Sequence, residues 1–435
     1  MIVYALRREC MEISPFVAYS NPLKRFTKGG RYMRLVIDCF KLIKGVGKSI
    51  GIYNVAKIIV GSLGAQNAAK SVTSNIAESM TSNPVDNDAG KHPDKIFVLG
   101  NSRNRADFDV PGVEFIQIDK YDPENKIDIV MWELFHVANC CRKLKADRVF
   151  FPRGYAALTH PVYDIVMIHD LIPFYYAEHF PGVFNRLENS YITNRLKQSA
   201  RTAKKVITIS EASKQDIMKY CGIDEKKIRV INNSYEKSDV PIVKDEDQKP
   251  YICAMTSALP HKNAKGIIET YERYCEIVKD ASAGESFEND PSPQDPLDLV
   301  LIGLNDVSEF DLPSEVKDRI TCHKFIGDTA EMYRVMGGAK AFLFLSLIEG
   351  FGLPPIEAMQ LGVPVICSGV SSLPEVCGDA ALLVDPKDPD EAAQNLKDLL
   401  SDDELRSTLI KRGYENVKRF SPESRAAKYR KEIME

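Results

Sequence analysis

The 435-residue chain lacks any apolar run of eighteen residues, so the sequence predicts no membrane-spanning helix. It also lacks a basic excess, because 57 lysines and arginines stand against 61 aspartates and glutamates. That balance argues against nucleic acid as a partner. The ten cysteines include no C-x-x-C pair, and only Cys140 and Cys141 are adjacent. We therefore expect reduced thiols in a cytoplasmic protein rather than a disulfide framework or a zinc site.

Residues 1–32 differ in composition from the rest of the chain. They carry six basic and two acidic residues and no sustained apolar run, which argues against a secretory signal. Two interpretations stay open. The segment is either a flexible extension, or a basic arm drawn to anionic lipid that would place the protein at the inner face of a membrane.

From Met33 onward, short apolar runs alternate with amphipathic segments, the pattern of βαβ units in a parallel sheet. The chain is too long for one ordinary core. The predicted strands are 34–40, 95–100, 148–152, 164–170, 205–210 and 228–233, then 251–257, 297–303, 320–327, 341–346, 364–368 and 381–385. We expect an α/β protein of two doubly wound, Rossmann-like domains, 33–235 and 251–420. Their ligand cleft would lie between them.

The boundaries follow from composition. Residues 236–250 are polar and contain two prolines, which predicts a linker between the domains. Residues 421–435 read as a last helix after a break at "SPES", and we expect this helix to pack back on the first domain.

A glycine-containing turn, "KGVGKSIG" (44–51), follows the first predicted strand. Its spacing fits neither the P-loop nor the dinucleotide fingerprint. Gly45 and Gly47 would still let the backbone approach an anionic ligand at a helix start. An ordinary tight turn explains the pattern equally well.

The stretch "LSLIEGFGLPPIEAMQLGVPVICS" (345–368) places Glu349 and Glu357 eight positions apart around a glycine loop. A buried strand precedes the loop, and two prolines mark a helix start after it. The amides of Phe351, Gly352 and Leu353 would then face a pyrophosphate. We place Glu357 in the first turn of the helix, with the two carboxylates gripping polyols on either side of the diphosphate.

From about Met33 to Phe420 the chain resembles the retaining glycosyltransferases of the GT-B fold, family four. Within that family it resembles the mannosyltransferase-like group of bacterial polysaccharide pathways. The resemblance is carried by the E-x7-E motif from Glu349 to Glu357, by "SSLPEVCGDAALLVDP" (371–386) and by "HDLIP" (169–173). It makes the first domain the acceptor side and the second the nucleotide-sugar side.

The resemblance also implies roles. Glu349 would meet the donor sugar, Glu357 the nucleotide ribose, and Lys262 of "SALPHKN" (257–263) the diphosphate. Where the family often has arginine before that lysine, this chain has His261, so charge compensation would be weaker. The remaining residues that the resemblance assigns to the site are His169 beside the reacting sugar and, around the nucleotide and its phosphates, Gly45, Gly47, Ser257, Phe351, Gly352 and Leu353.

The implied activity is metal-independent, front-face transfer of a sugar, by first preference mannose from GDP-mannose, to a glycan or lipid-linked hydroxyl. Two alternatives stay open: a UDP-sugar-dependent glucosyl or galactosyl transferase, and a catalytically silent subunit that binds nucleotide sugars. No cofactor is expected.

Overall fold

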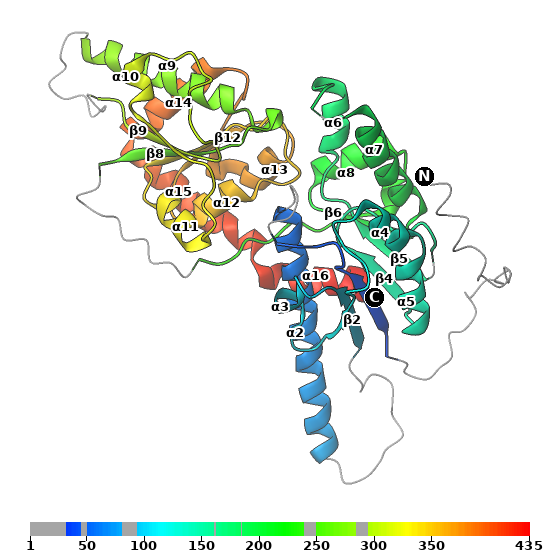
Figure 1. Ribbon diagram of the computed structural model, residues 1–435. Helices are drawn as coiled ribbons and strands as arrows, with labels where there is room; N and C mark the ends of the chain where they lie inside the picture. The colour runs from blue at the N-terminus through cyan, green and yellow to red at the C-terminus, as the bar shows by residue number, and fades with distance from the viewer. Residues whose placement is uncertain are drawn as a thin grey trace.

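The structure is a computed structural model that describes residues 32–44, 50–80, 94–160, 162–183, 185–238, 249–283 and 295–435. It forms two lobes, each built on one parallel sheet (Figure 1). Except for Tyr32, the predicted extension lies outside the described residues, as does most of the predicted linker.

The first lobe contains a seven-stranded sheet of order β3-β2-β1-β4-β5-β6-β7, parallel throughout. Its strands are β1 Arg34–Asp38, β2 Lys95–Gly100, β3 Glu114–Gln117, β4 Arg148–Phe151, β5 Tyr163–Met167, β6 Lys205–Thr208 and β7 Ile228–Val230. Its helices are α2 Ile50–Met80, α3 Arg105–Phe108, α4 Lys126–Met131, the π-helix η2 Trp132–His136, α5 Val137–Lys143, α6 Ile172–His179, α7 Arg186–Thr202, α8 Glu211–Cys221 and η3 Glu225–Lys227.

The second lobe contains a six-stranded parallel sheet of order β10-β9-β8-β11-β12-β13. Its strands are β8 Tyr251–Met255, β9 Asp298–Ile302, β10 Ile320–His323, β11 Ala341–Phe344, β12 Val365–Ser368 and β13 Ala381–Val384. Its helices are η4 Pro260–Lys262, α9 Ala264–Ala283, α10 Ser314–Lys317, α11 Thr329–Gly337, α12 Leu353–Gln360, α13 Leu373–Cys377, η5 Gly378–Ala380, α14 Pro389–Ser401, α15 Asp403–Val417 and η6 Lys418–Phe420, followed by α16 Pro422–Met434. The predicted fold class, α/β with two doubly wound parallel sheets, is confirmed.

In each sheet the strand order reverses at one point, between β1 and β4 in the first lobe and between β8 and β11 in the second. Loops that leave such a switch point diverge to opposite faces, so the crevice between them is where doubly wound sheets bind ligands. The order of the strands therefore directs attention to the loops after β1, β4, β8 and β11.

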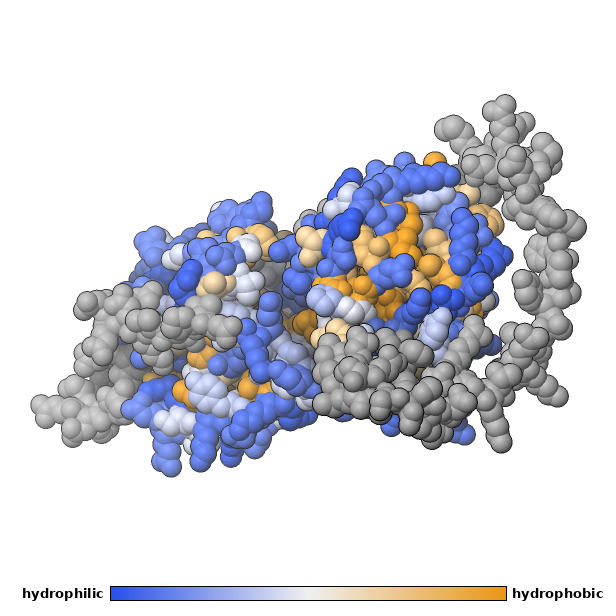
Figure 2. Space-filling model, turned by 90° about the horizontal axis from the view of Figure 1, so that it is seen from below, coloured by the Kyte–Doolittle hydropathy of each residue, from blue (hydrophilic) through white to orange (hydrophobic). Residues whose placement is uncertain are grey.

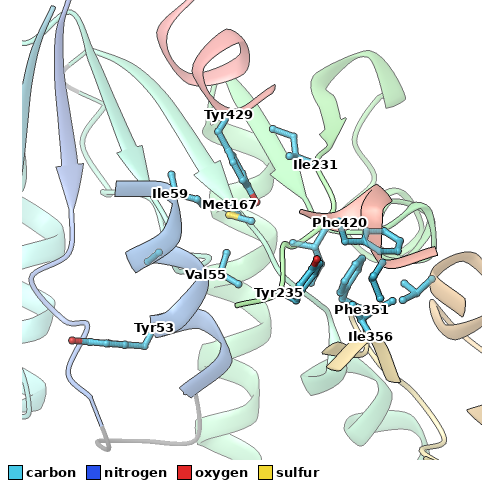
Figure 3. Packing of buried hydrophobic residues seen from close by; sticks show 14 of the residues in the cluster. Tyr53, Val55, Ile59, Met167, Ile231, Tyr235, Phe351, Ile356, Phe420 and Tyr429 are labelled. Carbon is cyan, nitrogen blue, oxygen red and sulfur yellow. The ribbon is translucent and has the colours of Figure 1, made fainter. Parts of the chain in front are cut away.

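The two lobes share one apolar cluster. Figure 3 shows Met167 and Ile231 of the first lobe, Phe351 of the second, and Phe420 and Tyr429 near the C-terminus within the same packed group. The Phe351 and Phe420 rings meet edge to face at 5.4 Å. Because this cluster is buried, the junction resembles a domain core. On the face seen in Figure 2, hydrophilic residues surround a broad hydrophobic area in the middle of the right-hand lobe.

Helix α16 runs from the second lobe to the first, where it lies beside α2 (Figure 1). Arg148 donates to the carbonyls of Ile433 and Glu435, at 3.2 and 2.6 Å, and Lys205 pairs with Glu432 at 3.0 Å. Ile433 is fully buried and contributes about 1.5–3 kcal/mol. The chain thus closes on the amino edge of the first sheet.

Several strand predictions need correction. Strand β7 ends at Val230 rather than Asn233 and β10 at His323 rather than Gly327, because the register of paired residues with the neighbouring strand ends there. Strand β5 ends at Met167 rather than Asp170, so His169 lies two residues beyond the strand instead of ending it. Strand β3, "EFIQ", was not predicted. It lies at the sheet edge with no fully buried residue, so it lacks the apolar run that marks the central strands.

Candidate active site

The loop between β11 and α12 is the centre of the candidate site. Gly352 caps α12 with a left-handed φ of 96°, and a β-carbon there would meet Leu373 Cδ2 at 2.4 Å. Pro354 and Pro355 follow in the first turn, where their missing amides cost nothing. The predicted order of strand, glycine loop and proline-led helix is confirmed.

The amides of Phe351, Gly352 and Leu353 make no internal hydrogen bond within the described part of the chain. The Phe351 side chain is buried in the shared cluster (Figure 3), so the residue contributes to the site through its backbone. Free amides at a helix start carry the positive end of the helix dipole. This corner of the fold is therefore suited to an anion.

Two of the predicted residues meet here: Lys262 Nζ lies 2.5 Å from Glu349 Oε1. The Glu349 side chain is only 9% exposed and that of Lys262 26%, so the pair is largely shielded from water. The backbone of Glu349 is held by two serines that follow β12. Ser371 Oγ and Ser372 Oγ donate to its carbonyl at 2.7 and 3.0 Å.

The position of Lys262 is fixed by the residue that follows it. Asn263 adopts a left-handed conformation with φ 54°, and its side-chain amide donates to the carbonyls of Leu345 and Pro386 at 2.9 and 2.8 Å. Thr256 Oγ1 donates to the Lys262 carbonyl at 2.8 Å. These bonds tie the loop after β8 to the loop after β11, the two loops of the second sheet's switch point.

Gly350 brings the two lobes into backbone contact. A β-carbon on it would lie 2.9 Å from Asp170 Cβ and 3.0 Å from the carbonyl oxygen of His169. Its own carbonyl accepts hydrogen bonds from Ser210 Oγ at 2.8 Å and Ser213 Oγ at 3.2 Å. Only glycine allows this approach, so the loop of the second lobe contacts the segment that follows β5.

His169 and Asp170 are both buried at this contact. Burial lowers the pKa of His169 to about 4, and its Nε2 donates to the Pro152 carbonyl at 2.7 Å. The ring is therefore neutral with Nδ1 free to accept. Burial, and to a smaller extent the Glu349 carboxylate, raises the pKa of Asp170, to which sequence reasoning assigned no role.

His261 is not an exposed cation. It is buried, and its Nδ1 is hydrogen-bonded to the Tyr176 hydroxyl of α6 in the first lobe. Burial and the neighbouring Lys262 lower the pKa of His261 to about 4, so the ring is neutral near pH 7. His261 therefore connects the lobes, and Lys262 alone supplies charge in this loop.

Glu357 lies in the second turn of α12, not in the first as predicted, because the helix begins at Leu353 under the Gly352 cap. Burial, with a contribution from Glu236, raises the pKa of Glu357 to about 7. Its carboxylate forms no hydrogen bond within the described residues, which leaves it available to a ligand hydroxyl. Ser257, two residues after β8, accepts from Leu259 N at 3.3 Å, whereas Gly45 and Gly47 lie outside the described residues.

Comparison with known families decides the class of this site. Residues 93–238 match the family described as Glycosyltransferase Family 4, and residues 236–416 match Glycosyl transferases group 1. An O-antigen chain mannosyltransferase of Escherichia coli is 30% identical over 278 residues, which cover 60% of this chain and 67% of that protein. The chain belongs to the GT-B glycosyltransferases.

Other relatives of this glycosyltransferase agree with that assignment. The O-antigen chain mannosyltransferase RfbU of Salmonella typhimurium is 30% identical over 230 residues, 51% of this chain and 57% of its own length. This chain therefore spans little more than half the length of that relative. Among solved structures, HepE of Anabaena, crystallised with UDP, superposes with a TM-score of 0.60 at 15% identity, covering 92% of this chain and 99% of that one. At this identity the likeness concerns the fold.

The glycosyltransferase holds its two lobes together through residues that sequence reasoning did not select. The Glu375 carboxylate of α13 accepts from the Glu211 amide at the start of α8 at 2.9 Å, and from Asn232 Nδ2 at 3.2 Å. No local signal marks such contacts, since their partners are more than a hundred residues apart. In the ranges that the structure describes, no helix is long and apolar enough to span a membrane and no acidic, histidine and cysteine group is placed to hold a metal.

Proposed function

We propose that this glycosyltransferase moves mannose from GDP-mannose to a hydroxyl of a glycan or lipid-linked acceptor, with retention at the anomeric carbon. The observation that carries the proposal is the Lys262–Glu349 pair beside the unengaged amides at the start of α12. The pair offers a cation to a diphosphate and a carboxylate to sugar hydroxyls. The names of the Salmonella and E. coli relatives support the choice of mannose.

In the proposed step, the bond between the anomeric carbon and the diphosphate oxygen breaks as the acceptor oxygen bonds to the same face of that carbon. The acceptor proton passes to the departing phosphate oxygen. Lys262, the 351–353 amides and the α12 dipole compensate the charge that develops on the diphosphate, without a metal ion. Glu349 and the free Nδ1 of His169 accept hydrogen bonds from sugar hydroxyls.

Glu357 is proposed to hold the ribose. Its carboxylate is half-buried on the same helix whose start receives the diphosphate, and it has no hydrogen-bond partner in the described chain. One turn of helix separates the phosphate-binding amides from this carboxylate. A nucleoside diphosphate laid along α12 would satisfy both.

The first experiment is thermal unfolding of the purified protein with GDP, UDP, ADP and TDP at equal concentration. A ligand at a hundred times its dissociation constant stabilises the folded state by about 2.7 kcal/mol. We expect a selective response to GDP. A selective response to UDP would instead identify a UDP-sugar donor, and no response to any nucleotide would refute the proposed function.

The second experiment measures transfer of labelled mannose from GDP-mannose in the Glu349→Ala variant. Loss of the carboxylate removes its hydrogen bonds to the sugar, so we expect transfer to be abolished. Glu404→Ala, an exposed position on α15, is the matched control and should transfer normally. Wild-type turnover in Glu349→Ala would exclude the assigned role.

A further inference from the structure

The first lobe has a pocket of its own at its switch point. It is lined by residues that follow β1 and β4 and by residues from the end of α4 and from η2: Asp38, Phe40, Lys41, Ile129, Trp132, Glu133, Arg153 and Tyr155. The space measures about 290 Å³, part of it open to solvent. Its enclosed part is about the size of one water molecule, so a bound group would lie in the open mouth.

The floor of this pocket is internally satisfied. Trp132 Nε1 donates to both oxygens of Asp38 at 3.2 Å, and the Phe40 ring stacks on Trp132 at 4.4 Å. Phe40 N also donates to Asp38 at 3.2 Å. Because Asp38 already accepts these hydrogen bonds, it holds the indole in place. We do not expect it to bind a ligand.

The two carboxylates in the walls are already engaged. Glu133 is paired with Arg195, whose guanidinium lies 3.0 Å from the carboxylate and also donates to the Ala156 carbonyl at 2.9 Å. Within the described residues, Lys41 and Arg153 have no carboxylate at ion-pair distance, although both line the pocket. The lining holds two carboxylates and two cations, but both carboxylates already have partners, since Asp38 accepts from Trp132 and Glu133 pairs with Arg195 from outside the lining.

The two unpaired cations also oppose each other. Burial and the Arg153 guanidinium lower the pKa of Lys41 to about 8, and the Glu133 carboxylate offsets this only in part. A half-buried lysine held next to an arginine is unfavourable unless an anion joins them. The pocket wall adds a π-helical turn, η2, a conformation often found at functional sites.

The pocket adjoins the site of transfer. Arg153 follows Pro152, whose carbonyl accepts the hydrogen bond from His169 Nε2 at 2.7 Å, and the His169 backbone contacts Gly350 of the donor loop. Lys262 belongs to the other lobe, so a ligand in this pocket would approach from the side opposite the donor diphosphate.

We propose that Lys41 and Arg153 bind an anionic group, a phosphate or a carboxylate, of the acceptor substrate. The inference rests on the proposed function, because it assumes that a sugar is transferred at the neighbouring junction. The acceptor would thus be an acidic or phosphorylated glycan rather than a neutral one. The bound anion would position the acceptor, and with it the distance between the attacking hydroxyl and the anomeric carbon.

The test uses calorimetric titration of the full chain, saturated with the nucleotide that it prefers, so that the donor site is filled. The probes are inorganic phosphate, methyl glucuronide and, as the neutral analogue, methyl glucoside. We expect phosphate or the glucuronide to bind and the glucoside not to bind. A preference for phosphate identifies a phosphorylated acceptor, and a preference for the glucuronide an acidic sugar.

The variants Lys41→Gln and Arg153→Gln should each lower the affinity for the anion by about tenfold or more. This is the effect of losing one charge-assisted hydrogen bond. Lys143→Gln and Arg142→Gln, exposed positions on α5, are the matched controls and should bind it normally. Nucleotide affinity should stay unchanged in all four.

Three results would overturn the inference: no anion bound by a wild-type protein that binds nucleotide, equal binding of glucoside and glucuronide, or a loss of nucleotide affinity in Lys41→Gln and Arg153→Gln. The last would assign the pocket to the donor. A wild-type protein that binds no nucleotide would instead refute the proposed function, so the two failures are distinguishable.

Discussion

Gly350→Ala is the sharpest test of how the two lobes meet. The added β-carbon would lie 2.9 Å from Asp170 Cβ and 3.0 Å from the His169 carbonyl oxygen. Carbon atoms in ordinary contact are about 3.5–4.0 Å apart, so the donor loop must retreat by roughly 0.5–1 Å. The retreat would also lengthen the bonds from Ser210 and Ser213 to the Gly350 carbonyl.

The expected consequence is catalytic. A misplacement of about 1 Å can lower a rate by about a hundredfold, and a smaller retreat lowers it less. We therefore expect kcat/KM to fall by about 10–100-fold, which corresponds to about 1.4–2.7 kcal/mol of transition-state stabilisation. Overpacking of this kind costs about 1–3 kcal/mol of stability, a loss that both lobes should survive.

The assay is transfer of labelled sugar under subsaturating donor, with urea unfolding measured in parallel. Gly61→Ala is the matched control, because a β-carbon at this position of α2 meets no atom within 4 Å. It should leave kcat/KM unchanged. If Gly350→Ala retained the wild-type kcat/KM while folded, the close approach of the lobes would have no part in transfer.

Three further changes probe the surroundings of the site. Asn263→Ala removes two carbonyl hydrogen bonds and leaves a left-handed backbone without a suitable side chain, so urea unfolding should show a loss of about 2–4 kcal/mol, with Asn263→Gly recovering about 1 kcal/mol. Tyr176→Phe leaves the buried His261 Nδ1 without this hydrogen-bond partner and should cost about 1–3 kcal/mol in the same assay; an unchanged midpoint and slope would contradict the contact. Glu357 has a folded pKa of about 7 against an ordinary 4.5, so the folded state keeps a proton that the unfolded state releases between these values. The unfolding free energy should therefore fall as pH rises through that window, and Glu357→Gln should flatten the fall; a wild-type pH dependence in this variant would contradict the shift.

Local signals account for the parts of the structure that the sequence predicted. The apolar run 341–346, the glycines after it and the prolines at the helix start each act within a few residues, and together they define the loop that carries Glu349. Helix α8 is likewise bounded by local signals, since Ser210 accepts from Ser213 N at its start and Gly222 ends it with φ 65°.

Contacts across the lobes are what the sequence could not supply. The bond from Tyr176 to His261 joins residues 85 positions apart, and that from Ser210 to Gly350 joins residues 140 apart. The motifs that contain His261 and Gly350 do not indicate which residue of the other lobe each one contacts. The motifs do place Glu349 and Lys262, which the structure brings together at 2.5 Å.

The position of Glu357 shows how a local error arises. Two adjacent prolines mark a helix start but do not say which helical position each one takes. Gly352 can adopt the left-handed cap, so Leu353 becomes the first helical residue and the prolines the second and third. Glu357 is thereby carried beyond the first turn, where it gains burial and loses the helix dipole.

The Lys262–Glu349 pair has a consequence for donor binding. At 2.5 Å each charge is already neutralised by the other, so a diphosphate must share or displace the Glu349 carboxylate to reach the Lys262 ammonium. If sugar hydroxyls take over the freed carboxylate, the exchange costs little, because each ion gains a new partner as it loses the old one. A nucleoside diphosphate without a sugar offers no such partner to Glu349. The intact sugar nucleotide should therefore bind more tightly than the free diphosphate, and Glu349→Gln should reduce that difference.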